Sequence, residues 1–262
     1  MTDALFRHHG GGRYEPTGSA RGAWDPGIVH GAAVAALVVG RLGTRSGTIS
    51  RFTIDFLAPV PFEELTLELD EPIGGRRVQR RRARLLHGDR TVAEALALIV
   101  ATNDLELPDK ALRHHTPFDP DAVPDLCEPN HGAREVIGHD CFDSESVIVQ
   151  RMRVEGDPRI HQWIGLAGDV VDDEALQPIE VATVAADYAQ GAVHRRLPFG
   201  DWSYRNAEQT LHFARAPRGN WIGSRCDFVG SNLGAGYNSA DLFDEAGRFG
   251  QAAGALVIET RG

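Results

Sequence analysis

The sequence predicts an α+β protein in which one unit, a helix followed by antiparallel strands, is used twice. Two internal matches predict the duplication. Residues 53–56 (TIDF) match residues 210–213 (TLHF) at an offset of 157, and each segment runs on to a proline, Pro59 or Pro217. Residues 88–100 match residues 246–258 at an offset of 158. Both of these consist of a turn, an arginine, and a strand of small and aliphatic residues.

The first copy begins with an apolar helix, predicted over residues 29–42. Val34, Leu37, Val38 and Leu42 follow helical spacing, and the alanines between them allow close packing. Four strands are predicted after this helix, and a turn at residues 87–90 joins the last two into a hairpin. The predicted strands are residues 50–57, 64–69, 77–86 and 91–101.

The second copy repeats this order after a predicted strand at residues 160–166. Its helix is predicted over residues 179–190, led by Pro178, a residue that suits the first helical position. The remaining predicted strands are residues 208–214, 221–229, 236–243 and 249–259, and the turn at 244–247 corresponds to the first hairpin turn.

Residues 104–140 separate the copies and are rich in Pro, His and Asp, with little periodicity. We interpret this stretch as a linker on the surface. The expected division is an N-terminal unit over residues 1–105, a linker over 106–140 and a C-terminal unit over 141–262.

A helix of small residues before an antiparallel meander, made twice, predicts the double hotdog fold. Each sheet wraps around its own helix, and small side chains let the helix backbone lie close to the sheet. The two sheets are expected to join edge to edge, because this pairs two strand edges that would otherwise promote aggregation.

Composition excludes several classes of protein. The 262 residues carry 27 Lys and Arg against 37 Asp and Glu, a net charge of −10, which argues against nucleic acid as a partner. The longest apolar run, residues 32–40, is about half the length of a membrane span. The N-terminus lacks the apolar stretch of a signal peptide, so a cytoplasmic protein that does not act on membranes is expected.

No metal or redox cofactor is expected. Cys127, Cys141 and Cys226 are odd in number and far apart, which predicts neither a disulfide framework nor a thiolate metal site. A catalytic cysteine stays open, although buried or incidental thiols explain the three better. His114-His115 in the linker is too isolated to predict a metal site.

Three segments resemble a known family. Residues 24–32 (WDPGIVHGA) are similar to the W-x-x-G-x-V-H-G-G opening of double-hotdog proteins of the acyl-CoA thioesterase family. Residues 55–61 (DFLAPVP) resemble its D-F-L-x-P-V-P strand, and residues 206–215 (NAEQTLHFAR) resemble its N-x-D-L-T-x-H-F-x-R strand. The resemblance covers nearly the whole chain and implies the type II acyl-CoA thioesterase superfamily.

The resemblance implies hydrolysis of an acyl-CoA thioester to a free fatty acid and CoA. Type II members use an Asp with a Thr and a Gln from neighbouring strands. Carried over residue by residue, the Asp position falls at Glu208, the Gln position at about Gly254, and the Thr position near Phe228 or Val229. Both polar partners are therefore expected to be missing, and Gln251 points to the opposite face of a regular strand from Gly254.

Candidate catalytic residues follow from what a thioester carbonyl needs. Unpaired N–H groups at a helix start stabilise a developing oxyanion, which makes His30, Gly31 and Ala32 candidates at the first helix. A carboxylate in a partly apolar tunnel has a raised pKa and suits a general base, and Glu208 is that candidate. The alternatives are a tight helix–sheet contact at residues 30–32 and an exposed strand glutamate.

Further residues are candidates for binding substrate. Asn206 and Thr210 are expected to share the side of Glu208 in a polar row, or to form a solvated sheet face. Asp187 is a charged residue in an apolar helix, which predicts either a contact with substrate or a wet helix end. Arg82 lies in the densest basic run, residues 76–84, which predicts either CoA phosphate binding or a strand edge blunted by charge.

Three functions remain open from the sequence. The first is a thioesterase in which Glu208 activates water and a helix N-terminus holds the oxyanion. The second is a hotdog dehydratase or hydratase with His30 and Asp187 as an acid–base pair, one from each helix. The third is a non-catalytic acyl-CoA or lipid binder. Because double-hotdog proteins commonly pair through sheets or helices, a homodimer is expected.

Overall fold

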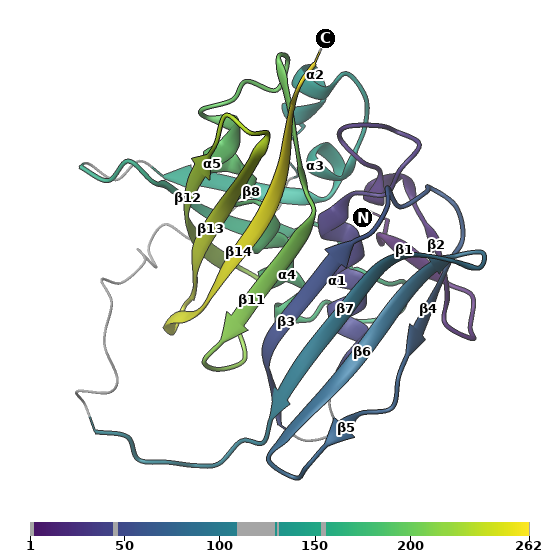
Figure 1. The fold of residues 1–262 in the computed structure, drawn as a ribbon, viewed down its shortest axis with the longest axis vertical. Helices are drawn as coiled ribbons and strands as arrows, with labels where there is room; N and C mark the ends of the chain where they lie inside the picture. Colours follow the sequence, from purple (N-terminus) through teal and green to yellow (C-terminus); the bar gives the residue numbers. More distant parts are fainter. Residues whose placement is uncertain (1–2, 44–46, 109–128, 130, 153–155, 262) are drawn as a thin grey trace.

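The computed structural model describes residues 3–43, 47–108, 129, 131–152 and 156–261. Its strands form one 14-stranded sheet with the order β1-β2-β4-β6-β7-β3-β11-β14-β13-β12-β9-β8, while β5 pairs with β6 and β10 pairs with β14 (Figure 1). Every strand pairing in this sheet is antiparallel. This architecture confirms the predicted α+β double hotdog.

The N-terminal half holds one long helix and most of the first sheet. The elements are β1 (Phe6–His8), β2 (Arg13–Pro16), the 3-10 helix η1 (Gly18–Ala20), α1 (Gly31–Arg41), β3 (Thr48–Phe56), β4 (Leu65–Leu69), β5 (Ile73–Gly74), β6 (Val78–His87) and β7 (Arg90–Val100). The predicted helix and four main strands all form, with ends that shift by one or two residues. β1, β2 and β5 were not predicted, because they are too short to show a period.

The C-terminal half repeats the plan with additions. Its elements are α2 (Ala133–Ile137), α3 (Phe142–Glu145), β8 (Val147–Met152), β9 (Ile160–Leu166), α4 (Pro178–Asp187), α5 (Gln190–His194), β10 (Trp202–Asn206), β11 (Glu208–Phe213), β12 (Ile222–Gly230), β13 (Ala235–Asp244) and β14 (Gly247–Thr260). The second helix ends earlier than predicted, at Asp187, and a separate short helix follows.

The two halves join through β3 and β11, as the edge-to-edge prediction requires. Thr53 and Thr210, which are equivalent in the internal repeat, lie directly opposite each other in the register of this pair. Their hydroxyl oxygens are 3.1 Å apart. An approximate two-fold relation between the halves therefore passes through this strand pair.

The helices α1 and α4 pack against each other behind the joined sheets (Figure 1). The six residues of α1 from Ala32 to Leu37, four of them alanines, are fully buried, together with Val181, Ala182, Val184 and Ala185 of α4. At one end of the pair, a Cβ on Gly40 of α1 would lie 2.1 Å from Glu180 Oε1 of α4, so the backbone and this carboxylate are in contact. Small side chains thus permit a close approach between the two helices, whereas the sequence predicted close packing of each helix on its sheet.

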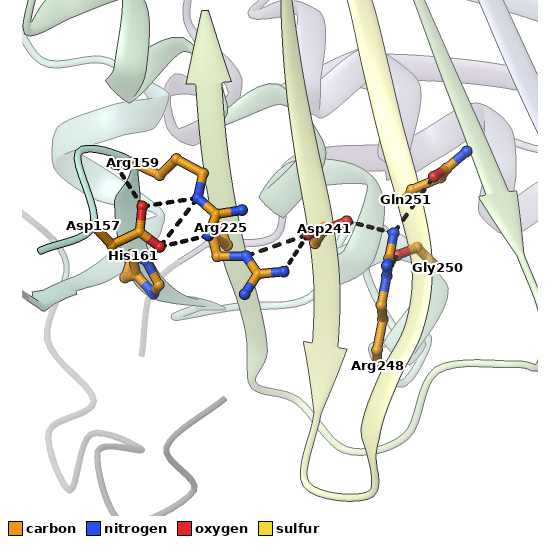
Figure 2. A network of polar contacts seen from close by, with 8 residues as sticks. All are labelled: Asp157, Arg159, His161, Arg225, Asp241, Arg248, Gly250 and Gln251. Carbon is orange, nitrogen blue, oxygen red and sulfur yellow. Dashed lines mark hydrogen bonds and ion pairs between the residues drawn. The ribbon is translucent and has the colours of Figure 1, made fainter. Parts of the chain in front are cut away.

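The outer face of the C-terminal sheet carries a row of charges (Figure 2). His161, Arg225, Asp241 and Gln251 are cross-strand neighbours on β9, β12, β13 and β14. Asp241 is ion-paired with Arg225 and with Arg248. Because the inner face packs on the helices, this polar row marks the face turned to solvent.

Most of the predicted linker, including His114, His115 and Cys127, lies outside the described residues. The unit boundaries at residues 105 and 140 stay a prediction. None of the helices in the described part of the chain is long and apolar enough to cross a membrane.

Candidate active site

Two adjacent cavities lie where the start of α1 meets the end of α4. One has a volume of about 270 Å³ and is bordered by α2, and we call it the α2 cavity. The other has a volume of about 330 Å³ and is bordered by the end of β3 and the segment up to Val60, and we call it the β3 cavity. Both are lined by Ala23, Trp24, His30, Asp187 and Gln190. These shared residues form the junction of the two cavities.

His30 caps the start of α1. Its Nδ1 accepts a hydrogen bond of 3.1 Å from the Ala32 N–H, so a neutral His30 carries its proton on Nε2. That Nε2 lies 3.4 Å from Asp143 Oδ2, and the imidazole stacks on the Phe142 ring with the two ring centres 4.7 Å apart. The imidazole is therefore held on both sides and borders both cavities.

Gly31 and Ala32 differ in what their N–H groups can do. The Ala32 N–H is used by His30, and Ala32 is fully buried and lines neither cavity. Gly31 lines the β3 cavity, and within the described residues no acceptor is found for its N–H. As the first residue of α1, Gly31 has no intrahelical partner for this donor either. Gly31 is thus placed to donate to a ligand, whereas Ala32 is not.

Asp187 is the buried carboxylate of the junction. It ends α4, is 5% exposed, and accepts a hydrogen bond of 2.6 Å from Asn206 Nδ2 through Oδ1. Burial raises the pKa of Asp187, while His30 and the Asn206 hydrogen bond act in the opposite direction. The expectation of a wet helix end is therefore wrong, and a contact of Asp187 with substrate stays a prediction.

Asp143 is a member of this group that the sequence did not reveal. It lies in α3, lines the α2 cavity, accepts a hydrogen bond of 2.6 Å from the Tyr188 hydroxyl, and faces His30. Its partners are 113 and 45 residues away along the chain, so no local spacing predicts the contact.

Glu208 does not face these cavities, which corrects the sequence prediction. Between β10 and β11, residues 207–209 oppose only residues 254–255 of β14, because Asn206 pairs with Leu256 and Thr210 with Ala253. This extra residue is a β-bulge, and it reverses the alternation of the side chains. Asn206 therefore points inward to Asp187, while Glu208 points to the outer face.

The surroundings of Glu208 agree with this placement. Gln209, the next residue, is buried and donates to the Thr183 carbonyl oxygen on α4. The Glu208 carboxylate instead accepts from the Ala255 N–H at 3.2 Å and from the Thr210 hydroxyl at 2.8 Å. Neither Glu208 nor Thr210 lines the two cavities, and both stabilise the bulge and the seam between the halves.

Arg82 is also distant from the junction. It lies on β6, which β7 and β3 separate from β11, and it pairs with Glu94 on β7 at 2.7 Å. The prediction that Arg82 binds substrate at this site is not supported by its position. The alternative, a charged strand face, matches the cross-strand ion pair.

Two asparagines lie beside Gly254, the position at which the family pattern has a glutamine. A Cβ on Gly254 would lie 2.9 Å from Asn238 Oδ1 and 3.3 Å from Asn206 Oδ1. Within the described residues, Asn206 Oδ1 and Asn238 Nδ2 are buried without a hydrogen-bond partner. Two amide groups thus lie beside the position at which the family pattern places a glutamine.

The described histidines, cysteines and carboxylates also bear on metal and thiol chemistry. The described residues contain no group of three or more His, Cys, Asp or Glu that could hold a metal ion. Cys141 and Cys226 are buried free thiols. Burial raises the pKa of Cys141 to about 11 and that of Cys226 to about 12, so neither is a thiolate at neutral pH.

Solved structures share this fold over almost the whole chain. A hot dog fold protein of unknown function from Alicyclobacillus acidocaldarius has a TM-score of 0.72 at 14% identity, covering 97% of this chain and 96% of its own. An acyl-CoA thioesterase II from Mycobacterium marinum has a TM-score of 0.67 at 13% identity, covering 98% and 95%. At these identities the likeness establishes the fold. No curated protein matches the sequence.

Family models match both halves of the chain. The model described as the acyl-CoA thioesterase N-terminal domain matches residues 20–100, which include His30 and Gly31. The model described as the acyl-CoA thioesterase C-terminal domain matches residues 108–253, which include Asp187 and Asn206. Together with the duplicated sheet and the buried carboxylate at the junction of the two helices, these matches show that the chain belongs to the acyl-CoA thioesterase family.

Proposed function

We propose that the protein hydrolyses acyl-CoA thioesters, with Asp187 as the general base. The position of Asp187 is the main support for this proposal. Asp187 is buried, accepts a hydrogen bond from Asn206 and lines both cavities, and Gly31, whose N–H has no acceptor among the described residues, lines one of them. Glu208, the candidate from the sequence, is replaced because it faces the other side of the sheet.

The reaction needs three groups in defined roles. Asp187 takes a proton from water, which attacks the thioester carbonyl carbon, and the Asn206 amide holds the Asp187 carboxylate by its hydrogen bond to Oδ1. The Gly31 N–H, at the positive end of the α1 dipole, stabilises the oxyanion. When the tetrahedral intermediate collapses, the C–S bond breaks and the CoA sulfur receives the proton from Asp187. The products are a carboxylic acid and CoA.

His30 and Asp143 act as positioning residues in this proposal. His30 fixes the first turn of α1 through the Ala32 N–H, and Asp143 fixes the His30 ring and the Tyr188 hydroxyl. This arrangement aims the Gly31 N–H into the β3 cavity without contributing a proton to the reaction. Pre-set donors of this kind lower the cost of reorganisation during catalysis.

One observation favours dehydration or hydration as a second candidate function. His30 and Asp187 come from different helices and line the same two cavities, as an acid–base pair for a 3-hydroxyacyl thioester requires. The capped Nδ1 of His30 argues for the hydrolase, because this nitrogen is occupied by the Ala32 N–H.

The experiment follows CoA release with a thiol reagent across straight-chain acyl-CoAs of increasing length. We expect turnover by the wild type, a loss of ~100-fold or more in Asp187→Asn, and near wild-type rates in the matched control Glu208→Gln. Circular dichroism checks that both variants fold. Absence of release at every length, or an equal loss in both variants, would contradict the hydrolase. Tight binding without release would select a non-catalytic binder, and water loss from a 3-hydroxyacyl-CoA the dehydratase.

We further propose that the enzyme works in lipid metabolism as a cytoplasmic homodimer. The two described cysteines are unpaired thiols, which fits a reducing compartment. Val229, Tyr237 and Val257 are each between 43% and 50% exposed on neighbouring strands, which favours contact with a second copy. Light scattering gives the mass in solution, and a monomer at micromolar concentration would contradict the dimer.

A further inference from the structure

The two cavities differ in the side chains that line only one of them. The β3 cavity has an apolar wall that includes Ile28, Phe56, Leu57, Val60 and Val257. Its arginine, Arg205, is ion-paired with Glu259 on the neighbouring strand. This cavity therefore suits a hydrocarbon chain better than an anionic group.

The α2 cavity has polar and aromatic walls and an arginine of different character. Arg151, on β8, lines it together with His194, Tyr188, Phe199 and Tyr204. Among the residues that the structure describes, no hydrogen bond or ion pair of the Arg151 guanidinium is found. The guanidinium lies beside α5, with Nη2 4.0 Å from where a Cβ on Gly191 would be. Arg151 is thus a cation at the cavity wall that is available to a ligand.

The charge of Arg151 acts on a second residue that lines this cavity. Burial lowers the pKa of His194, and the charge of Arg151 lowers it further. A second guanidinium, that of Arg261, lies over the rings of Trp24 and Phe199 at 4.8 and 4.5 Å from their centres. Arg151 lines this cavity and Arg261 lies against two of its aromatic rings, and these two cations favour an anionic group there although the carboxylates of Asp143 and Asp187 also line it.

We propose that the thioester lies across both cavities, with its acyl chain in the β3 cavity and its pantetheine arm in the α2 cavity, where Arg151 binds a phosphate of CoA. Arginine binds phosphate oxygens bidentately, and an unpaired guanidinium needs no ion pair broken first. The reacting carbonyl then lies at the junction, beside Asp187 and Gly31. This inference rests on the proposed thioesterase function and adds the orientation of the substrate.

A carboxylate at the end of an acyl chain offers Arg151 the same anionic oxygens, so the experiment separates the two sources. Steady-state kinetics are measured with a neutral straight-chain acyl-CoA and with the same acyl group on pantetheine, which lacks the phosphates. We expect Arg151→Ala to raise KM for the acyl-CoA about tenfold or more at nearly constant kcat, the loss typical of a hydrogen bond to a charged group. KM for the pantetheine thioester stays unchanged, and Arg151→Lys recovers part of the loss.

The matched control is Arg195→Ala, since Arg195 is an exposed arginine near α5 that lines neither cavity. An unchanged KM in Arg151→Ala, or an equal rise with both substrates, would overturn the orientation while the hydrolase stands. A rise confined to pantetheine thioesters of dicarboxylic acids would overturn it in favour of an acyl carboxylate. If the wild type hydrolyses nothing, calorimetry with CoA and with pantetheine tests the contact alone. Arg151→Ala that binds CoA more weakly than the wild type does, and pantetheine equally well, supports the phosphate contact. Arg151→Ala that binds CoA as tightly as the wild type overturns it.

Discussion

Replacing Glu180 with glutamine should stabilise the protein at neutral and alkaline pH. Glu180 lies in the first turn of α4 and is 2% exposed. One carboxylate oxygen accepts from the Gln177 N–H at 2.8 Å, and the other lies against Gly40 of α1. Burial raises the pKa of Glu180 from 4.5 to about 7, although the Gln177 hydrogen bond and Arg41 oppose this. The folded chain therefore holds this proton over a range in which the unfolded chain has lost it.

The sign and size of the effect follow from this difference. Below pH 4.5 the carboxyl is protonated in both states and contributes its full stability. As the pH rises towards about 7, only the unfolded state ionises, so the free energy of unfolding falls. Above that range both states are ionised and the loss is complete. With about 1.4 kcal/mol for each pKa unit, the loss is roughly 3 kcal/mol.

Urea denaturation at several pH values between 5 and 8 measures this effect. Glu180→Gln keeps an amide oxygen for the Gln177 N–H and does not titrate, so its stability relative to the wild type should rise by about 2 to 3 kcal/mol over the range. The exposed Glu245→Gln is the matched control and should show no trend. A difference between wild type and Glu180→Gln that stays constant with pH would refute the reasoning.

Three further predictions concern the helix ends and the junction. Gly40→Ala should destabilise the fold by about 1 to 3 kcal/mol in urea denaturation, because its Cβ would meet Glu180 Oε1 at 2.1 Å, and the added loss should shrink when Glu180 is also replaced by Ala. Asn206→Ala should move the acidic limb of the kcat/KM profile to higher pH, since it removes a hydrogen bond to the ionised Asp187; an unmoved limb would argue against Asp187 as the base. His30→Ala should lower kcat about tenfold and change KM little, because the first turn of α1 loses its cap. A change confined to KM would contradict a positioning role.

The regular elements were predictable because their signals are local. The alternating pattern of β3, β7 and β14 and the small-residue stretch of α1 each report on their own burial, and the internal repeat identified Thr53 and Thr210 as equivalent positions. That these two residues pair across the seam comes from the structure. His30 and Gly31 were found from the sequence as well, because a helix start is a local feature.

The identity of the carboxylate was not predictable by the same means. The alternation of a regular strand over residues 206–212 predicts that Asn206 and Glu208 point to the same face of the sheet. The structure has one extra residue there, at the bulge, so the two side chains point to opposite faces. A bulge is set by the pairing with β14, which lies some fifty residues later in the chain. The sequence did single out Asp187, as a charge within an apolar helix. Only the structure, in which α4 lies beside β10, shows that Asn206 donates a hydrogen bond to its carboxylate.

Because the chain is duplicated, the start of one helix meets the end of the other at both ends of the helix pair. The side chains at the two ends nevertheless differ. At one end, the start of α1 meets the end of α4, where Gly31 and Asp187 border open cavities. At the other end, the start of α4 meets the end of α1, and Glu180 packs directly on the Gly40 backbone. A carboxylate is thus buried at both ends, but only that of Asp187 has space for a substrate beside it. Burial raises the pKa of both carboxylates. Glu180 is surrounded by packed atoms, whereas Asp187 also borders a cavity, so we place the proposed chemistry at the Asp187 end of the helix pair.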